Sequence, residues 1–286
     1  MGLFDDILMT VDMDRTLTAT DGTIPQRNIE AIRYFMENGG HFTVNTGRSN
    51  NSMRPYMDKV PVNAPLLLIN GSASFEDGHM TNIRTIDLDM WPTLDRVAAE
   101  FPEMNLEIQQ EDNHYMIRAS QEYLDFYARM GWTQAPAEHG KSYGPFMKFV
   151  LYGQPWGNDI NCMYQGSAEE LARFDAAEAF IKREFAGKVE VFRAAPRIID
   201  VHAKGVSKLR AARELQARLG KKILVCVGDA ENDITMLDGA DYAYCPADGV
   251  VADRYENVCC CADGAVADVI YHKLPEILKP CHSEKK

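Results

Sequence analysis

The sequence contains no apolar run that approaches the roughly 20 residues needed to cross a bilayer. It also has no basic N-terminal stretch followed by a long apolar segment, which is the pattern of a secretory signal. We therefore expect a cytoplasmic protein that does not bind membranes. Positive charge is scarce too: 30 lysines and arginines stand against 42 aspartates and glutamates, so the net charge is −12. Because no basic stripe is available to neutralise phosphates, nucleic acid is not expected as a partner.

Cysteine pairs of the metal-binding kind are also missing. No Cys-x-x-Cys occurs among the seven cysteines, so a zinc site is not expected. The adjacent residues Cys259, Cys260 and Cys261 cannot easily bridge one another, and reduced thiols agree with a cytoplasmic location. If these three lie in a strand, alternation should bury at least one of them as a small hydrophobic side chain. Cys226 lies within the apolar run 223–227 and is expected in the core.

The composition is that of an ordinary globular protein. The chain has 286 residues, of which 46% are hydrophobic and 25% are charged. This length allows two domains, each with its own core. The negative net charge means that a site for an anionic substrate would need local positive charge. Monomer and homodimer are both left open.

Both ends of the chain alternate short apolar runs with amphipathic segments. The runs predict strands at 7–11, 42–44, 66–69 and 223–227. A helix is expected between Pro25 and Gly39, and apolar positions from Val206 to Leu219 predict another that ends at Gly220. This alternation predicts an α/β fold, a doubly wound, Rossmann-like parallel sheet with helices on both faces.

Residues 83–197 follow a different pattern, in which helices are interleaved with short strands. A long helix is predicted after Ser167, which forms a capping box with Glu170. The strand 146–151 carries Lys148 among apolar residues, and this lysine is either a substrate-facing residue or an ordinary surface residue. We expect residues 83–197 to form an inserted α+β cap domain, with residues 1–82 and 198–286 forming a discontinuous catalytic core.

The unusual polar clusters of the flanking segments each follow a predicted strand. They are Asp12 with Asp14, Thr46 with Arg48, Asn70, and Asp229 with Asp233. Ligands bind outside the carboxyl ends of the strands in an open parallel sheet, so we expect the four clusters to meet in one crevice. A single acidic pair after a strand is often only a turn or a helix cap. Four clusters at one edge are much harder to explain in that way.

Three of these acids suit a magnesium ion. Asp12, Asp14 and Asp229 form an oxygen-only set of hard ligands, and a divalent cation would let Asp12 and Asp14 both stay ionised. A carboxylate beside Mg²⁺ and a bound phosphoryl group suggests nucleophilic catalysis through an aspartyl-phosphate. The second carboxylate can then act as acid and later as base. Thr46 and a lysine can hold the phosphate oxygens.

Four segments resemble, in order, the four motifs of the haloacid dehalogenase (HAD) superfamily. They are Asp12-Met13-Asp14-Arg15-Thr16-Leu17, Thr46-Gly47-Arg48-Ser49, Gly205-Val206-Ser207-Lys208 and Gly228-Asp229-Ala230-Glu231-Asn232-Asp233. The insert and the segment GDAENDITML resemble the Cof-type (IIB) branch of sugar-phosphate phosphatases, which carries a C2B cap. The first and fourth motifs are specific together, whereas the other two alone would be weak. The resemblance implies a Mg²⁺-dependent phosphatase that acts on a small phosphorylated metabolite.

The resemblance also implies catalytic and metal-binding roles. Asp12 matches the nucleophile and a magnesium ligand. Asp14 matches the general acid/base, whose backbone carbonyl also binds magnesium. Asp229 matches the third protein ligand of the metal, and Lys208 matches the lysine that steadies the nucleophile and the phosphoryl group.

Further residues match the phosphate-binding part of the family's site. Thr46 and Gly47 correspond to the phosphate-binding second motif, and Arg48 follows at its edge. Asn232 matches a phosphate contact, and Asp233 matches a supporting carboxylate. Arg48 can equally be a surface residue at the start of a helix.

The sequence departs from the family pattern at two positions. Arg15 stands where most relatives have glycine, and Leu209 follows the lysine where glycine is usual. Lys204, four residues before Lys208, is a competing candidate for the motif lysine. We favour Lys208.

Two other functions fit the same motifs. A phosphomutase would share the chemistry but return the phosphoryl group to a sugar instead of water. A noncatalytic sugar-phosphate-binding regulatory protein would keep the fold and lose an acid, and the retention of all the acids counts against it.

Overall fold

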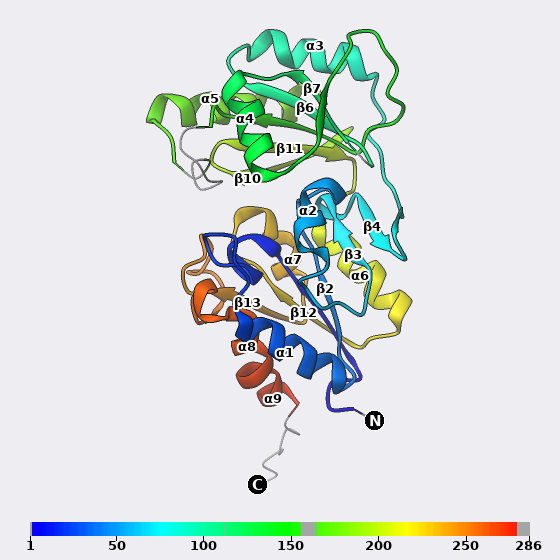
Figure 1. The fold of residues 1–286 in the computed structure, drawn as a ribbon, viewed down its shortest axis with the longest axis vertical. Coiled ribbons are helices and arrows are strands. Elements are labelled where there is room, and N and C mark those ends of the chain that lie inside the picture. Colours follow the sequence, from blue (N-terminus) through cyan, green and yellow to red (C-terminus); the bar gives the residue numbers. More distant parts are fainter. Residues whose placement is uncertain (1, 112, 156–162, 164, 279–286) are drawn as a thin grey trace.

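The computed structural model describes residues 2–111, 113–155, 163 and 165–278. Figure 1 shows two parts, one above the other along the long axis, with both described chain ends in the lower part. The lower part is the core domain and the upper part is the insert. No helix among the described residues is both long enough and apolar enough to span a membrane.

The core domain is built on a five-stranded sheet with the order β14-β13-β12-β1-β2. Every neighbouring pair in it is parallel. The strands are β1 (Ile7–Val11), β2 (His41–Val44), β12 (Ile223–Val227), β13 (Tyr242–Pro246) and β14 (Glu256–Val258). A parallel bridge from Asn45 to Leu67 attaches β3 (Leu66–Leu68) beyond β2. The prediction of a doubly wound parallel sheet is confirmed.

Alternation along β1 explains why its sequence is apolar at every position except Thr10. Ile7, Met9 and Val11 pack on one face, in a cluster that includes side chains of α1, α8 and α9. Leu8 packs on the other face, against side chains of α6 and α7. Because helices cover both faces, apolar residues predominate on both sides of such a strand. The helices are α1 (Gln26–Glu37), α6 (Lys208–Leu219), α7 (Ile234–Asp238), α8 (Ala265–Asp268) and α9 (Leu274–Ile277).

An antiparallel hairpin leads from the core domain into the insert. It consists of β4 (Ala73–Glu76), which pairs with β3, and β5 (His79–Thr81). The short helix α2 (Asn50–Met57) lies on the same side of the core domain and faces the insert in Figure 1. Ser49 caps this helix by accepting a hydrogen bond from the backbone N–H of Ser52.

The insert contains a six-stranded sheet with the order β10-β11-β9-β6-β7-β8. All its pairs are antiparallel except β7 with β8. The strands are β6 (Asn105–Gln109), β7 (His114–Arg118), β8 (Gln134–Pro136), β9 (Lys148–Tyr152), β10 (Val189–Ala195) and β11 (Ile198–Ala203). This is the α+β cap that the sequence predicts.

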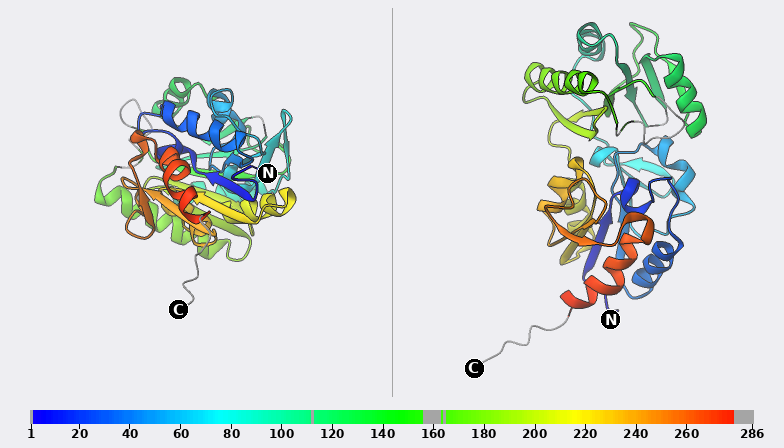
Figure 2. Two further views of the ribbon diagram at one scale, coloured as in Figure 1. Left: turned by 90° about the horizontal axis from the view of Figure 1, so that it is seen from below. Right: turned by 90° about the vertical axis from the view of Figure 1, so that its left-hand side faces the viewer.

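Among the described residues of the insert, three α-helices cover its sheet unequally. The helices α3 (Met90–Glu100) and α5 (Ala168–Glu184) pack on one face, and the predicted Ser167–Glu170 capping box begins α5. The helix α4 (Gln121–Met130) packs with Val150 and Tyr152 on the other face. The views in Figure 2 show the rest of that face turned toward the core domain.

One domain boundary lies at a different place from the predicted one. The strand β11 hydrogen-bonds to β9 and β10, which places residues 198–203 in the sheet of the insert. The sequence pattern placed the end of the insert at residue 197 and so assigned these residues to the catalytic core. We propose that the chain returns to the core domain at residues 204–207.

The cysteines follow the expected pattern only in part. Cys226 is buried in β12, as predicted, and Cys261 is buried as well. The run 259–261 does not lie in a strand, because β14 ends at Val258, and Cys259 and Cys260 are partly exposed. The described cysteines are all free thiols, and Cys162 and Cys281 lie outside the described residues.

Asn51 of α2 joins the two parts of the molecule through a reciprocal pair of hydrogen bonds. Its Nδ2 donates to the carbonyl of Thr133 (2.7 Å), and its Oδ1 accepts from the N–H of Thr133 (3.1 Å). Replacing Asn51 with alanine should therefore speed hydrogen exchange at the amide of Thr133 by about fivefold, because each such bond contributes about 1 kcal/mol.

Hydrogen exchange with mass spectrometry checks this expectation. Amides of β12 in the same variant should exchange at the wild-type rate, and so should Thr133 in an Arg54→Ala control, in which the changed residue is exposed on the same helix. Unchanged protection of Thr133 in Asn51→Ala would contradict the proposed role of Asn51.

Candidate active site

The turn after β1 presents the first acidic pair. The amide of Asp12 donates to the carbonyl of Val227 (2.9 Å), which fixes Asp12 at the carboxyl end of the sheet. Thr18 closes the turn, because its backbone N–H and its hydroxyl both donate to the carbonyl of Met13. Arg15, between them, has a φ of 61°. This left-handed conformation favours glycine, which agrees with the glycine that the family resemblance leads us to expect at this position.

Lys208 lies between two buried carboxylates. Its Nζ is 2.5 Å from Oδ1 of Asp12 and 2.6 Å from Oδ1 of Asp233. Burial disfavours the charged ammonium, but the two carboxylates outweigh it and raise the pKa of Lys208. The site therefore contains a local positive charge, although the net charge of the chain is negative.

Three carboxylates form a cluster around this lysine. One oxygen each of Asp12, Asp229 and Asp233 lies within 4.8 Å of the others, and all three residues are buried. Burial raises the pKa of Asp12 to about 7, although the charge of Lys208 opposes the rise. Burial and the charge of Asp12 raise the pKa of Asp229 as well. The cluster holds more negative charge than one lysine neutralises.

The donor set fits a hard divalent cation. It consists of carboxylate oxygens only, without histidine or cysteine. Oδ1 of Asp229 accepts a hydrogen bond from the hydroxyl of Thr16 (2.9 Å). Its Oδ2 accepts no hydrogen bond from any described residue and lies 3.8 Å from Nε of Arg15. A buried oxygen of this kind is available to a metal ion.

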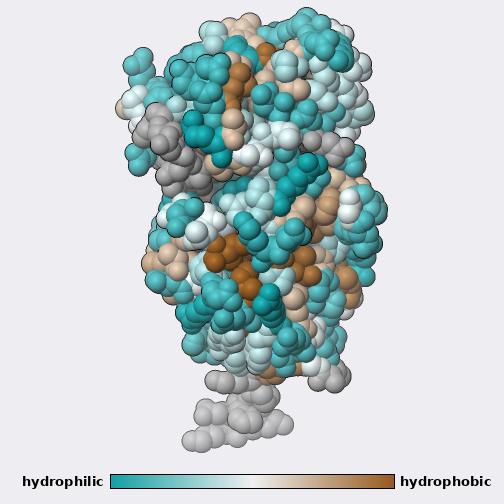
Figure 3. Space-filling view, viewed as in Figure 1, coloured by the Kyte–Doolittle hydropathy of each residue, from teal (hydrophilic) through white to brown (hydrophobic). Residues whose placement is uncertain are grey.

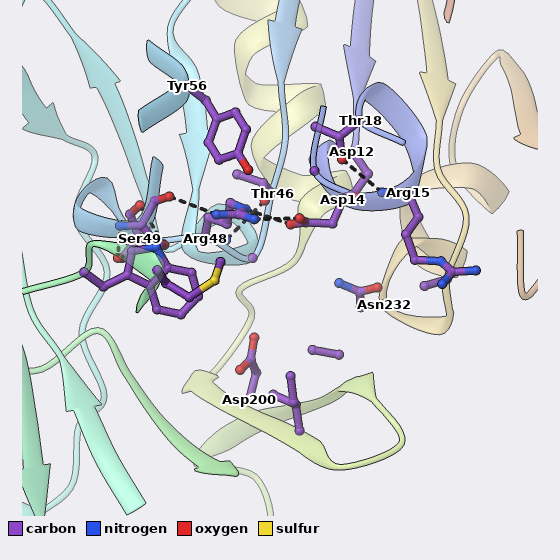
Figure 4. A pocket seen from close by; sticks show the side chains of 18 of the residues that line it. Asp12, Asp14, Arg15, Thr18, Thr46, Arg48, Ser49, Tyr56, Asp200 and Asn232 are labelled. Atoms are coloured by element: carbon purple, nitrogen blue, oxygen red, sulfur yellow. Dashed lines mark hydrogen bonds and ion pairs between the residues drawn. The ribbon is translucent and has the colours of Figure 1, made fainter. Parts of the chain in front are cut away.

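Asp14 has a different environment from the one expected for a metal-binding carboxylate. Both its oxygens accept hydrogen bonds from Arg48, from Nε at 2.8 Å and from Nη2 at 2.7 Å, as Figure 4 shows. Asp233, predicted only as a supporting acid, occupies the third place in the carboxylate cluster instead. The metal-binding role of Asp14 stays a prediction, and it concerns the backbone carbonyl of this residue.

Arg48 determines the protonation of Asp14. Burial would raise the pKa of Asp14, but the charge and hydrogen bonds of Arg48 outweigh burial and lower that pKa below its usual range. The guanidinium lies over the rings of Tyr56 (4.9 Å) and Trp132 (5.8 Å). Arg48 is thus held by both domains and is not an ordinary surface residue.

The second motif forms a tight loop after β2. The backbone N–H of Arg48 donates to the hydroxyl of Thr46 (3.2 Å), and Thr46 is buried. A Cβ at Gly47 would lie 3.2 Å from Oδ1 of Asn70, so the loop has little room for a larger residue there. Asn70, the remaining strand-end residue of the sequence pattern, therefore lies directly beside this loop.

The fourth motif is shaped by Asp233. Its Oδ2 accepts hydrogen bonds from the backbone N–H groups of Asp229 (3.0 Å) and Ala230 (3.1 Å). This folds the segment so that Asp229 faces the cluster, while Asn232 lines the cavity and lies below Asp14 in Figure 4. The four predicted clusters do meet at one edge of the sheet.

The two candidate lysines lie in different places. Lys208 is buried against Asp12, whereas Lys204 is exposed and pairs with Glu190 of the insert at 2.8 Å. Only Lys208 can therefore act on a group bound to Asp12. The difference follows from the start of α6, because Ser207 caps the helix and Lys208 is its first residue.

The site opens into a cavity of about 320 Å³ between the two domains. Core residues such as Asp12, Asp14 and Arg48 line one side, and Gln109, Lys148 and Asp200 of the insert line the other. In Figure 3 the surface is indented between the upper and lower parts of the molecule. A small molecule in this cavity would touch both domains.

The cavity contains insert residues that sequence patterns did not single out. They are the buried polar strand residues Gln109, His114 and Asp200. In the sequence, each is a polar residue next to an apolar residue. Only the strand register shows that they share a face of the sheet. Lys148 was noticed, but it is neither exposed nor a free cation, because it is 3% exposed and pairs with Asp200 at 3.1 Å.

A parallel α/β core with an inserted α+β cap, and an aspartate-lysine-aspartate cluster at the sheet edge, define a HAD-type protein. The model of the family described as haloacid dehalogenase-like hydrolase matches residues 9–251. This chain belongs to the haloacid dehalogenase-like hydrolase family, as its motifs predict.

Solved structures with the same fold include three that cover nearly the whole chain. A haloacid dehalogenase-like hydrolase from B. subtilis is 17% identical, with 93% of this chain and 99% of that chain covered and a TM-score of 0.75. The subclass IIB sugar phosphatase BT4131 is 17% identical (93% and 98% covered, TM-score 0.74). BT1666, a phosphatase of the superfamily from Bacteroides thetaiotaomicron, is 16% identical (94% and 95% covered, TM-score 0.71).

The ion pair between Arg48 and Asp14 makes a testable electrostatic prediction. In Arg48→Met the pKa of Asp14 should rise by about one unit or more, because the lowering charge is gone and burial remains. Titration of the Asp14 carboxyl carbon by NMR measures this directly. The control is Arg54→Met, which removes an exposed arginine from α2 and should leave Asp14 unchanged. Equal titration curves for wild type and Arg48→Met would refute the assignment.

Proposed function

We propose that this protein is a Mg²⁺-dependent phosphatase that hydrolyses a small phosphorylated metabolite through an aspartyl-phosphate on Asp12. The observation that carries the proposal is the contact between Lys208 and Asp12 inside the carboxylate cluster, 2.5 Å long. A sugar phosphate is the favoured substrate class, because one structural relative is a sugar phosphatase and the cavity extends to polar residues of the insert. The reducing cytoplasm is the proposed location.

In the first half of the proposed reaction, a carboxylate oxygen of Asp12 attacks phosphorus. The P–O bond to the alcohol breaks, and the leaving oxygen takes a proton from the carboxyl group of Asp14. Lys208 favours the ionised form of Asp12 and holds it in place, and its ammonium also opposes the charge on the phosphoryl oxygens. Thr46 and Asn232 are the proposed neutral phosphate contacts.

In the second half, water attacks the phosphorus of the aspartyl-phosphate. Asp14, now ionised, takes a proton from this water, and the bond between phosphorus and Asp12 breaks. Inorganic phosphate leaves, and Asp12 is a carboxylate again. The two acids of the first motif thus have separate tasks, which agrees with their separate partners, Lys208 for Asp12 and Arg48 for Asp14.

Asp14 must be protonated to act as an acid, and its pair with Arg48 opposes this. A bound phosphate ester brings oxygens that compete for the same guanidinium, which is suited to bidentate binding of phosphate. Transfer of Arg48 from Asp14 to the substrate raises the pKa of Asp14. Substrate binding therefore prepares the acid for the first step.

The metal completes the electrostatics of the proposed site. The oxygen atoms of Asp12 and Asp229 and the backbone carbonyl of Asp14 are the proposed ligands, and Asp233 holds the loop that carries Asp229. When bound, Mg²⁺ neutralises negative charge on the phosphoryl group and on the acids. Lys208 alone cannot do this, since it already pairs with two carboxylates.

Two matched variants separate the roles of the two acids. Asp12→Asn should lower turnover of p-nitrophenyl phosphate by about 10⁴-fold, because an amide is a poor nucleophile. Asp14→Asn should also turn over slowly, but it should accumulate phosphoenzyme, because p-nitrophenolate leaves without a proton and only the hydrolytic step needs the base. Phosphoprotein mass spectrometry after mixing and quenching measures this difference.

An exposed acid that does not line the cavity serves as the control for these variants. Asp87→Asn should keep the wild-type rate. Circular dichroism should show that all three variants are folded. A near-normal rate in Asp12→Asn would exclude Asp12 as the nucleophile, and phosphoenzyme in Asp12→Asn would place the covalent bond elsewhere.

Metal binding should depend on pH in a defined direction. The pKa of Asp12 in the folded metal-free protein is about 7, above the ordinary 3.8, so Asp12 destabilises the fold progressively as pH rises between these values. A cation binds the ionised form. Mg²⁺ should therefore raise the melting temperature by about 5 °C at about pH 8 and by much less at about pH 5.5.

Thermal unfolding of chelator-treated protein with and without MgCl₂ measures this effect. Asp229→Asn should abolish the stabilisation at both pH values, because it removes a carboxylate of the cluster. Full phosphatase activity in metal-free protein would contradict the proposed metal dependence.

A further inference from the structure

A row of buried polar side chains crosses the sheet of the insert. Lys148 of β9 lies opposite Gln109 of β6 and opposite His202 of β11, and Gln109 lies opposite His114 of β7. Directly opposite residues on antiparallel strands point to the same face of a sheet. All four are at most 3% exposed. The row faces the core domain, because its members make contacts there.

Three members of the row bind the core domain. His114 Nε2 lies 2.7 Å from the hydroxyl of Ser49, and Nζ of Lys148 donates to the carbonyl of Gly47 (3.1 Å). His202 Nδ1 lies 3.0 Å from the hydroxyl of Ser72. These contacts dock the insert onto the second motif and the end of β3. Their hydrogen-bonding groups are thereby occupied.

Gln109 differs from its neighbours in the row. Its Nε2 donates to Oε1 of Glu107 (2.7 Å), and this fixes the orientation of the amide. Its Oε1 accepts no hydrogen bond from any described residue, although Gln109 is only 3% exposed. Gln109 lines the cavity that also contains Asp12 and Asp14.

Asp200 presents a second oxygen of the same kind. It lies two residues before His202 on β11, so it points to the same face. Its Oδ2 accepts from Asn70 Nδ2 (3.0 Å) and Lys148 Nζ (3.1 Å). Its Oδ1 accepts no hydrogen bond from the described part of the chain, and Asp200 is 2% exposed. In Figure 4 the carboxylate of Asp200 points across the cavity toward Asp14 and Arg48.

Both oxygens can only accept hydrogen bonds. An amide oxygen has no proton, and Asp200 is ionised, because the nearby ammonium of Lys148 outweighs burial and lowers the pKa of Asp200. A buried acceptor without a partner carries a penalty of about 1–3 kcal/mol. A ligand that brings hydrogen-bond donors to this end of the cavity would remove that penalty. A ligand without donors would leave both oxygens desolvated.

We propose that Oε1 of Gln109 and Oδ1 of Asp200 bind hydroxyl groups of the alcohol part of the substrate and so select polyhydroxylated phosphate esters. This inference rests on the proposed phosphatase function, and it adds the residues that discriminate among phosphate esters. The phosphoryl group is bound by the core domain, and the hydroxyls are bound by the insert. Gln109 is then a specificity residue, separate from the chemistry at phosphorus.

Matched substrates test the subsite in the wild-type enzyme first. Glucose 6-phosphate and glycerol 3-phosphate are compared with cyclohexylmethyl phosphate and n-propyl phosphate, which have similar skeletons without hydroxyls. The wild-type enzyme should prefer at least one hydroxylated ester over its hydroxyl-free partner by about tenfold or more in kcat/KM, because each unpaired acceptor disfavours the hydroxyl-free ester.

The variant Gln109→Met then identifies the residue responsible. Methionine has a similar length and no acceptor oxygen, so the preference ratio for that ester pair should fall about tenfold. Intrinsic reactivity of the esters cancels, since the same two esters are compared in two enzymes. The matched control is Gln134→Met on β8, where the glutamine is exposed and does not line the cavity, and its ratio should equal that of wild type.

Each outcome decides one question. Equal losses for both members of the pair in Gln109→Met would show a structural role for Gln109 and overturn the inference. A wild-type enzyme that hydrolyses p-nitrophenyl phosphate but shows no preference for hydroxylated esters would overturn it too, while the proposed function stands. If the wild-type enzyme with Mg²⁺ hydrolyses none of these esters, the proposed function itself fails. Because the substrate comparison needs no variant, the inference stays testable even if Gln109→Met does not fold.

Discussion

The ammonium group of Lys208 holds the candidate site together. Asp12 and Asp233 come from opposite ends of the chain, and each would repel the other in a buried environment if Lys208 did not lie between them. Removing one partner from a buried charge pair typically costs about 3–5 kcal/mol, because the other charge is left without compensation. The position of the lysine depends in turn on its place as the first residue of α6, directly after the capping Ser207. The geometry of the site therefore depends on how one helix begins.

The docking of the insert is polar, and this is the second determinant of the site. The insert meets the core domain through buried histidine, lysine and asparagine side chains, whose partners include the second-motif residues Gly47 and Ser49. Polar contacts of this kind are specific in geometry, and they exchange readily with water when the domains separate. A substrate that fills the cavity between the domains must be accepted by both surfaces at once.

The sequence predicts the location of the site better than its internal contacts. Because parallel strands place their carboxyl ends at one edge, the positions of Asp12, Thr46 and Asp229 after apolar runs were sufficient to bring them together. The pairing of Asp14 with Arg48 could not be predicted in the same way, because it depends on the direction of side chains that leave different strands. The position of the Gln109 acceptor beside the cavity depends on which residues of neighbouring strands pair with each other. The alternation of residues along one strand does not determine that pairing. The end of the insert was expected at residue 197, but the strand 198–203 pairs with β9 and β10, and its own sequence does not reveal these partners.

The order of strands in the core sheet has a consequence for synthesis of the chain. The strand β1 emerges from the ribosome before its neighbour β12, which is made only after the whole insert. Until then the apolar face formed by Leu8 lacks α6 and α7, and one edge of β1 has no partner strand. The insert contains its own sheet and its own core clusters, so it can fold before the core domain is complete. Until β12 is made, the nascent core domain therefore exposes an unpaired strand edge, the kind of surface that pairs with other chains.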